Sequence, residues 1–272
     1  MKIKKYVGSS EYEVMNRLKT ELGSDAIILD VKVGSGAFMK ELDDAISLSK
    51  EMVRLGTNYG RETVAIVTNM DEPLGRAVGN SLEVKEAIDV LRGNGPDDLR
   101  ELCLYIGSLL LVLAKRVNNQ EEGRKLLEEV ISSNLAFEKF CQLVEYQGGN
   151  VNQVKNPDLL PKSKYVIEVK SDMEGYVQFI DAERIGACAL KLGAGRETMD
   201  SVIDLSVGVV LNKKVNDKVM LGETLAYIHA NDLEKANEVN KEIKDIYKID
   251  KKPGKGKKLI YGMVNKEGVQ LF

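Results

Sequence analysis

Two apolar runs separated by an amphipathic segment constrain the fold of this chain most strongly. The first run (AIIL, residues 26–29) is unbroken, as expected for a strand that is covered on both faces. Residues 39–55 then place apolar side chains at helical spacing, and the second run (TVAIVT, residues 63–68) is rich in β-branched residues. Strand, helix and strand at this spacing predict parallel strands joined by a right-handed crossover. The expected fold is therefore α/β, with a partial parallel sheet and flanking helices.

A glycine-containing turn, VGSGAFM (residues 33–39), joins the first run to the helix. Gly34 and Gly36 allow backbone conformations and close approaches that a side chain would block. In open α/β sheets, ligands bind at the carboxyl ends of the strands, so this turn is the first candidate for a binding site. An ordinary strand-to-helix turn is the alternative that the Gly-x-Gly pair leaves open.

The middle of the chain has the pattern of several helices. The expected ranges are residues 81–91, a segment that begins at residue 97, residues 120–132 and residues 136–146. Asp97 or Asp98 is expected to cap the second of these helices, whose wide apolar stripe predicts a core position. A stretch with two prolines and several lysines and asparagines, residues 149–164, is interpreted as a linker.

Beyond the linker, short β patterns predominate. Strands are expected at residues 165–170, 175–180, 207–211, 218–220, 224–229 and 259–264, with a helix at 232–246. The segment from residue 208 to residue 229 resembles the hairpins of biotinyl/lipoyl-type barrel-sandwich domains. It has no Met-Lys-Met-like lysine at a hairpin tip, so a swinging-arm modification is not expected. The second part is predicted to be an α+β domain with a barrel-sandwich-like core.

The composition narrows the class of protein. The chain has 272 residues, of which 43% are hydrophobic and 30% charged, as is usual for a globular protein. Its net charge of -3 gives no reason to expect nucleic acid or an anionic membrane as partner. With 3 Cys, 1 His and no Cys-x-x-Cys, free buried thiols are expected and a zinc site is not. The most apolar stretch, residues 109–114, is too short to span a bilayer, and no signal peptide is expected, so the chain is predicted to be cytoplasmic.

Three long segments carry a family resemblance. They are DAIILDVKVGSGAFMK, GRETVAIVTNMDEPLGRAVGNSLEVKEAIDVLRGNGPDDLRELC, and KLGAGRETMDSVIDLSVGVVLNKKVNDKV with LAYIHA. From about Gly23 onward the chain resembles pyrimidine-nucleoside and thymidine phosphorylases. The resemblance implies phosphorolysis in nucleoside salvage: a pyrimidine nucleoside and phosphate give the free base and a pentose 1-phosphate. It also implies a homodimer.

The chain departs from this family in its first part. The family's Lys-His-Ser-Thr-Gly-Gly phosphate loop and the Arg, Ser and Lys that hold the base do not occur, and the one histidine is His229. The first 25 or so residues, with an expected strand and helix, resemble instead the N-terminal segment of the flagellar signal-recognition-type GTPase. They lack Gly-x-x-x-x-Gly-Lys-Ser/Thr, so no GTPase function follows. The expected division is residues 1–22, a partial phosphorylase domain at 23–148, the linker, and the family's C-terminal domain at 165–272.

The resemblance implies a small set of site residues. The substrate-binding set comprises Gly34, Ser35, Gly36 and Phe38, with core packing as the alternative for Phe38. Leu74, Ala77 and Glu86 match positions whose main-chain carbonyls help bind a potassium-like ion in the family, and a solvated helix position is the alternative for Glu86. The family's remaining ligands for this ion come from the missing phosphate loop, so the ion site is expected to be incomplete. Outside these sets, Lys32 is a candidate for the exposed turn. Arg196 is expected in a structural turn, with a phosphate contact as the alternative, and His229 is expected at a strand end.

Two functional hypotheses follow. The first is a pyrimidine-nucleoside phosphorylase with phosphate as co-substrate. The second is a truncated or fused chain that folds or self-associates without turnover. The missing phosphate loop favours the second hypothesis for this chain, whereas the long family resemblance favours the first. The sequence does not distinguish uridine from thymidine as substrate.

Overall fold

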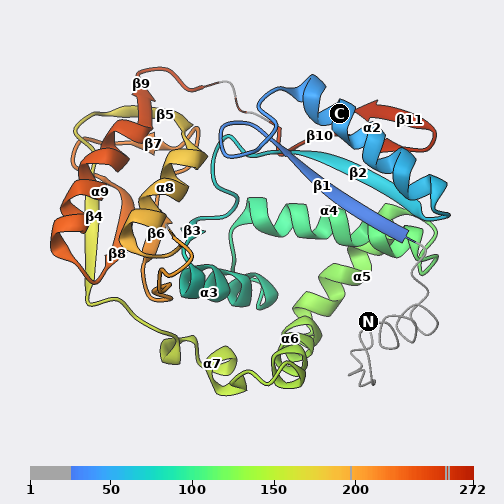
Figure 1. Ribbon diagram of the computed structural model, residues 1–272, viewed down its shortest axis with the longest axis horizontal. Helices are drawn as coiled ribbons and strands as arrows, with labels where there is room; N and C mark the ends of the chain where they lie inside the picture. Colours follow the sequence, from blue (N-terminus) through green and yellow to red (C-terminus); the bar gives the residue numbers. More distant parts are fainter. Residues whose placement is uncertain (1–25, 197, 255, 257) are drawn as a thin grey trace.

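The structure, a computed structural model, describes residues 26–196, 198–254, 256 and 258–272, in which helices are interleaved with three small sheets (Figure 1). Its helical segments are α2 (Leu42–Asn58), α3 (Asn80–Leu91), α4 (Asp97–Leu113), α5 (Gln120–Ser132), α6 (Leu135–Tyr146), α7 (Val151–Lys155), the 3-10 turn η1 (Pro157–Leu159), α8 (Ala182–Leu192) and α9 (Leu233–Ile246). Its strands are β1 (Ala26–Val33), β2 (Glu62–Asn69), β3 (Ala77–Val78), β4 (Tyr165–Lys170), β5 (Gly175–Ile180), β6 (Gly208–Leu211), β7 (Lys218–Val219), β8 (Thr224–Ala230), β9 (Tyr247–Asp250), β10 (Ile260–Asn265) and β11 (Gly268–Leu271). The strand and helix expected before Gly23 lie outside the described residues.

The first sheet has the strand order β1-β2-β10-β11. β1 and β2 run parallel along their whole length, from Ala26 opposite Glu62 to Val33 opposite Asn69. This confirms the predicted parallel pair with α2 as its crossover. β10 is antiparallel to β2, and β11 is antiparallel to β10, so the sheet as a whole is mixed.

Helices cover both faces of this sheet (Figure 1). On one face, α2 presents Ala45, Ser49 and Val53, which are four residues apart and therefore share one side of the helix. Ala45 and Val53 pack on the buried side chains of that face of the sheet, Val31, Val33, Ala65, Val67 and Val264. On the other face, Leu109 of α4 packs on Val64 and Ile66. This two-sided burial matches the continuous apolar run of β2, whose residues 63–68 are all buried, whereas residues 26–29 of β1 are only partly covered and Ile27 is 37% exposed.

The second part of the chain is built around one larger core. Its sheets have the orders β3-β6-β8-β4 and β7-β5-β9. The core includes fully buried side chains from these strands and from α8 and α9, among them Val177, Ile185, Leu211, Ile228 and Ile243. The whole molecule is thus mixed α/β, as predicted.

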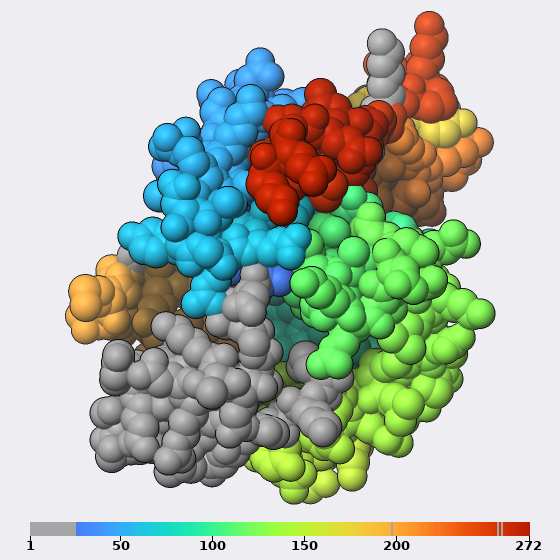
Figure 2. Space-filling model, turned by 90° about the vertical axis from the view of Figure 1, so that its right-hand side faces the viewer, coloured from blue at the N-terminus to red at the C-terminus, as the bar shows by residue number. Residues whose placement is uncertain are grey.

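Two strands cross between the two parts. β3 pairs with β6, so a segment that follows β2 enters the sheet of the second part. In return, β10 leaves the second part and pairs with β2. In Figure 2 the C-terminal segment (red) accordingly lies against the blue and cyan segment of the first part and beside the green helices. The two parts are therefore joined by paired strands as well as by side-chain packing.

Several local expectations need correction. α4 begins after Pro96 without a side-chain cap, so neither Asp97 nor Asp98 caps it, and both lie in its first turn. The predicted linker contains α7 and η1, and α8 and β9 were not predicted. Of the three cysteines, all free, Cys188 is buried and Cys103 is exposed, so the expectation of buried thiols holds only in part.

None of the helices in the described ranges is long and apolar enough to cross a membrane.

Candidate functional site

The glycine turn at residues 34–39, here called the 34–39 turn, follows β1 at the carboxyl end of the parallel pair. Gly34 has a φ of +128°, and a Cβ there would lie 2.7 Å from Asp71 Oδ1, so a side chain does not fit. The N–H of Gly34 donates to Met39 O at 3.0 Å. This hydrogen bond closes the turn on itself.

The segment after β2 holds the 34–39 turn in place. The Ser35 N–H donates to Asp71 Oδ1 at 3.1 Å, and the Ser35 hydroxyl donates to Asp71 O at 2.8 Å. The Gly36 N–H donates to Met70 O at 2.8 Å, and the Ala182 N–H of α8 donates to Ser35 Oγ at 3.3 Å. Three successive N–H groups of the turn are thus bonded to protein oxygens. The turn can therefore offer a ligand its side chains but not a nest of backbone donors.

Phe38 projects from this turn with 95% of its surface exposed. Core packing, the alternative for this side chain, is therefore wrong. The ring stands on a turn that is hydrogen-bonded to two other segments, and it presents a flat apolar face at the carboxyl end of a parallel strand pair. Such a ring is suited to contact with the face of a planar ligand.

A polar cluster on β1 and β2 lies just before the turn. Lys32 Nζ contacts Asp30 Oδ2 at 2.7 Å and donates to Thr68 Oγ1 at 3.0 Å, and Thr68 Oγ1 donates to Asp30 Oδ1 at 2.5 Å. Lys32 is therefore a strand residue in an ion pair, and its assignment to the exposed turn is wrong. Asp30 and Thr68 were missed as candidates. The alternation along β1, which puts Asp30 and Lys32 on one face of the strand, is the signal that could have found them.

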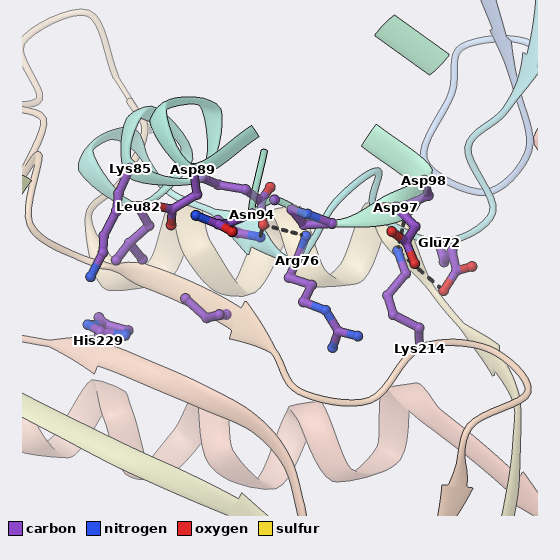
Figure 3. Close-up of a pocket in the computed structure, with 15 residues that line it drawn as sticks. Glu72, Arg76, Leu82, Lys85, Asp89, Asn94, Asp97, Asp98, Lys214 and His229 are labelled. Atoms are coloured by element: carbon purple, nitrogen blue, oxygen red, sulfur yellow. Dashed lines mark hydrogen bonds and ion pairs between the residues drawn. The ribbon is translucent and has the colours of Figure 1, made fainter. Parts of the chain in front are cut away.

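A separate cavity of about 750 Å³ lies among α3, the loop after β2, the start of α4 and strands of the second part (Figure 3). Lys85 and His229 lie at one end, and Glu72, Asp98 and Lys214 at the other. Five acidic side chains line the cavity, Glu72, Glu86, Asp89, Asp97 and Asp98, against three basic ones, Arg76, Lys85 and Lys214. This balance favours cations over anions in the cavity.

The structure brings two of the predicted potassium residues together at this cavity. Glu86 Oε1 accepts the N–H groups of Arg76 at 2.8 Å and of Ala77 at 3.1 Å. Gly75 has a φ of +67°, and a Cβ on it would lie 2.2 Å from Glu86 Oε2, so the loop fits closely over this carboxylate. Burial is the main cause that raises the pKa of Glu86, and its two backbone hydrogen bonds oppose the rise. Glu86 therefore organises the loop that contains Leu74 and Ala77, so a purely solvated helix position is excluded for it.

The side chain of Lys214, which belongs to the second part of the chain, contacts the same loop. Its Nζ atom donates to Pro73 O and, at 2.8 Å, to Gly75 O. It also lies 3.0 Å from Asp98 Oδ2 and 3.5 Å from Glu72 Oε2. We call these four oxygens the Lys214 cradle. No local pattern singles out Lys214, because its partners precede it by more than a hundred residues.

The described residues include no side-chain cluster that is typical of a transition-metal site. In the part of the chain that is described, no group of three His, Cys, Asp or Glu side chains could hold a metal ion. The carbonyl and carboxylate oxygens that converge beside this loop, Gly75 O and Asp98 Oδ2, surround the Lys214 ammonium group.

Two candidate residues remain, Arg196 and His229. Arg196 is exposed and follows the end of α8 at Gly193. His229 is the second-last residue of β8, with Nδ1 3.4 Å from Ser163 Oγ. Burial, and to a smaller degree Lys85, lowers the pKa of His229. Neither residue lies on the 34–39 turn.

Two known domain families match different parts of the chain. Residues 10–137 match the domain family described as glycosyl transferase family, a/b domain. Residues 176–250 match the pyrimidine nucleoside phosphorylase C-terminal domain.

Curated relatives are similar over most of the chain. A pyrimidine-nucleoside phosphorylase of Staphylococcus haemolyticus is 52% identical over 231 residues, which cover 85% of this chain and 53% of the relative. That of Geobacillus stearothermophilus is 45% identical over 247 residues, covering 91% of this chain and 57% of the relative. The chain thus spans about half the length of these relatives. The two domain matches and the relatives together place this chain in the pyrimidine-nucleoside phosphorylase family.

Proposed function

We propose that this chain takes part in the phosphorolysis of pyrimidine nucleosides, in which phosphate displaces the base and a pentose 1-phosphate forms. The observation that carries the proposal is the solvent-exposed ring of Phe38 on the 34–39 turn, which lies at the carboxyl ends of β1 and β2. Relatives that share about half of their length with this chain bear the name of that activity.

The proposed substrate-binding residues are Gly34, Ser35, Gly36 and Phe38. Ser35 and the two glycines fix the backbone, and Phe38 contacts the nucleoside. Cleavage of the glycosidic bond proceeds through an oxocarbenium-like state, so it depends on holding phosphate beneath the sugar and on stabilising charge on the departing base. A turn that is hydrogen-bonded to two other segments provides the fixed geometry that such positioning needs.

The carbonyls of Leu74 and Ala77, with Glu86, are proposed to help bind a potassium ion. The hydrogen bonds from Arg76 and Ala77 to Glu86, together with the acidic lining of the cavity, support this assignment.

We further propose that the chain forms a cytoplasmic homodimer that has no nucleic acid or membrane as partner. Its second part is proposed to have a barrel-sandwich-like core. Exposed apolar side chains on α4, α5 and α6, namely Leu110, Leu126, Leu135 and Leu143, support self-association. The paired sheets around one core support the barrel-sandwich assignment.

An assay of phosphate-dependent base release tests the activity. The purified chain is expected to release uracil from uridine or thymine from thymidine, and Phe38→Ala is expected to lower kcat/KM by about tenfold. Tyr59→Ala is the matched control, because Tyr59 is also an exposed aromatic residue, 82% exposed, but lies at the end of α2. If a chain with native circular dichroism releases no base above the blank, the second hypothesis, folding or self-association without turnover, replaces the first for this chain.

A further inference from the structure

We propose that the Lys214 ammonium group occupies a site that could otherwise hold a monovalent cation. Replacing Lys214 by a residue without the ammonium group is then expected to let a potassium or ammonium ion bind there. The site is the Lys214 cradle, whose carbonyls belong to Pro73 and Gly75. These are different oxygens from those of the proposed potassium site at Leu74, Ala77 and Glu86. The inference therefore stands whether or not the chain catalyses phosphorolysis.

The contacts of Lys214 match its bonding capacity. A lysine ammonium group has three N–H donors and no acceptor. Three oxygens lie within 3.0 Å of it, Pro73 O, Gly75 O and Asp98 Oδ2, and a fourth, Glu72 Oε2, lies at 3.5 Å. A shell made of carbonyl and carboxylate oxygens is also the shell that a weakly hydrated monovalent cation takes in proteins.

The burial of Lys214 shows that the cradle is closely fitted. The side chain is 13% exposed, against 23% for Glu72 and 30% for Asp98. Removing an ammonium group from water is costly unless its hydrogen bonds and its charge are both compensated. Here two carboxylates compensate the charge, and two carbonyls complete the hydrogen bonds.

The cradle is held by bonds that do not involve the Lys214 ammonium group. Asp98 Oδ2 accepts the Gly75 N–H at 3.1 Å, and Glu72 Oε2 accepts the Val215 N–H at 3.0 Å. Arg76 Nη1 donates to Asn212 O at 2.6 Å, which fixes the loop against the second part. A variant without the ammonium group would therefore retain converging oxygens with excess negative charge. In an acidic cavity, that arrangement draws a cation from solution.

Thermal unfolding in matched chloride salts tests the inference. The full chain and Lys214→Met are melted in about 100 mM potassium, ammonium or choline chloride. Lys214→Met is expected to be less stable than the parent chain in choline. In potassium or ammonium it is expected to melt about 2–4 °C higher than in choline, a gain that exceeds any gain of the parent chain.

Lys213→Met is the matched control. Lys213 is the neighbouring lysine, is 16% exposed, and pairs with Glu223 and the carbonyl of Lys218 outside the cradle. The Lys213→Met variant is expected to melt at a lower temperature than the parent chain, and potassium is not expected to raise its melting temperature. An equal potassium response in Lys213→Met, or none in Lys214→Met, overturns the inference.

Two further measurements keep the test decisive. If Lys214→Met does not fold, Lys214→Gln replaces it, because it removes the charge but leaves an amide donor. Thallium(I), a potassium mimic, is then titrated by NMR. The variant is expected to bind one more equivalent than the parent chain, and equal binding contradicts the inference. Any site that the parent chain shows and Glu86→Gln removes belongs to the separate potassium proposal.

Discussion

Gly36 lies beside the start of α8 and Gly186 lies within that helix, and the two glycines differ in the space that surrounds them. A Cβ on Gly36 would lie 2.6 Å from the Cβ of Ala182 and 3.0 Å from Met70 O. A Cβ on Gly186, inside α8, would meet no atom within 4 Å. The same substitution therefore has opposite consequences at the two positions.

Gly36→Ala is expected to lower the free energy of unfolding by about 1–3 kcal/mol, because the added methyl group forces the 34–39 turn away from α8. Gly186→Ala is expected to raise it by about 0.5–1 kcal/mol, because alanine favours a helix interior. Urea unfolding of the two variants measures both changes. Equal effects in the two variants would contradict the close packing of Gly36 on Ala182.

His229 gives the stability of the fold a defined dependence on pH. Its pKa is lowered in the folded state by burial and by Lys85, whereas in the unfolded chain it takes its ordinary value of about 6.5. As the pH falls below about 6.5, the unfolded chain binds the proton first, so the free energy of unfolding decreases until the folded pKa is passed. Above both values, this effect is absent.

The free energy of unfolding is therefore expected to fall between about pH 7 and 5.5, and His229→Gln is expected to remove part of that slope. Because the chain has a single histidine, an NMR titration of its ring gives the folded pKa directly. A folded pKa at or above 6.5 would refute the prediction.

At the scale of elements, β10 and β11 are neighbouring strands with unequal roles. β10 lies between β2 and β11, and Val264 in it is 2% exposed. β11 is an edge strand whose four residues are all exposed. The first sheet is therefore complete only when β10 is in place, whereas β11 adds little burial.

A chain that ends at residue 258 is expected to lose more than about 4 kcal/mol of stability or to fail to fold, because it uncovers the edge of β2. A chain that ends at residue 267 keeps β10 and is expected to lose about 1 kcal/mol or less. Guanidinium unfolding followed by circular dichroism compares them. Similar losses for both deletions would show that β10 does not stabilise the first sheet.

The sequence predicted elements well where a single segment carries the signal. The apolar runs in β1 and β2 and the stripe of α2 define a parallel unit because each is a pattern within one continuous segment, and in β2 residues 63–68 are all buried. The pairings of β3 with β6 and of β10 with β2 could not be predicted, because the residues of one strand do not identify which distant strand it pairs with. α8 was missed although Asp181 caps it by accepting the Arg184 N–H, since it is short and lies among strands.

At the scale of the whole molecule, the candidate site shows the same limit. The 34–39 turn could be predicted because a glycine pair after a buried strand is a local pattern. The Lys214 cradle could not, because it joins a loop after β2, the first turn of α4 and a loop before β7. Asp98 illustrates the difference: it was expected to cap α4, yet it binds Gly75 and Lys214.

Because β10 pairs with β2 although it lies far later in the chain, β2 is synthesised well before its partner strand. Thr68 of β2 pairs with Ile260 of β10, so β2 emerges from the ribosome long before its neighbour exists. At 5–20 residues per second, this delay is roughly ten to forty seconds. For that interval one edge of β2 has no partner strand. An unpaired strand edge can pair with other chains and aggregate unless a chaperone covers it. The yield of folded chain in a cell should therefore depend on how quickly its last segment is made.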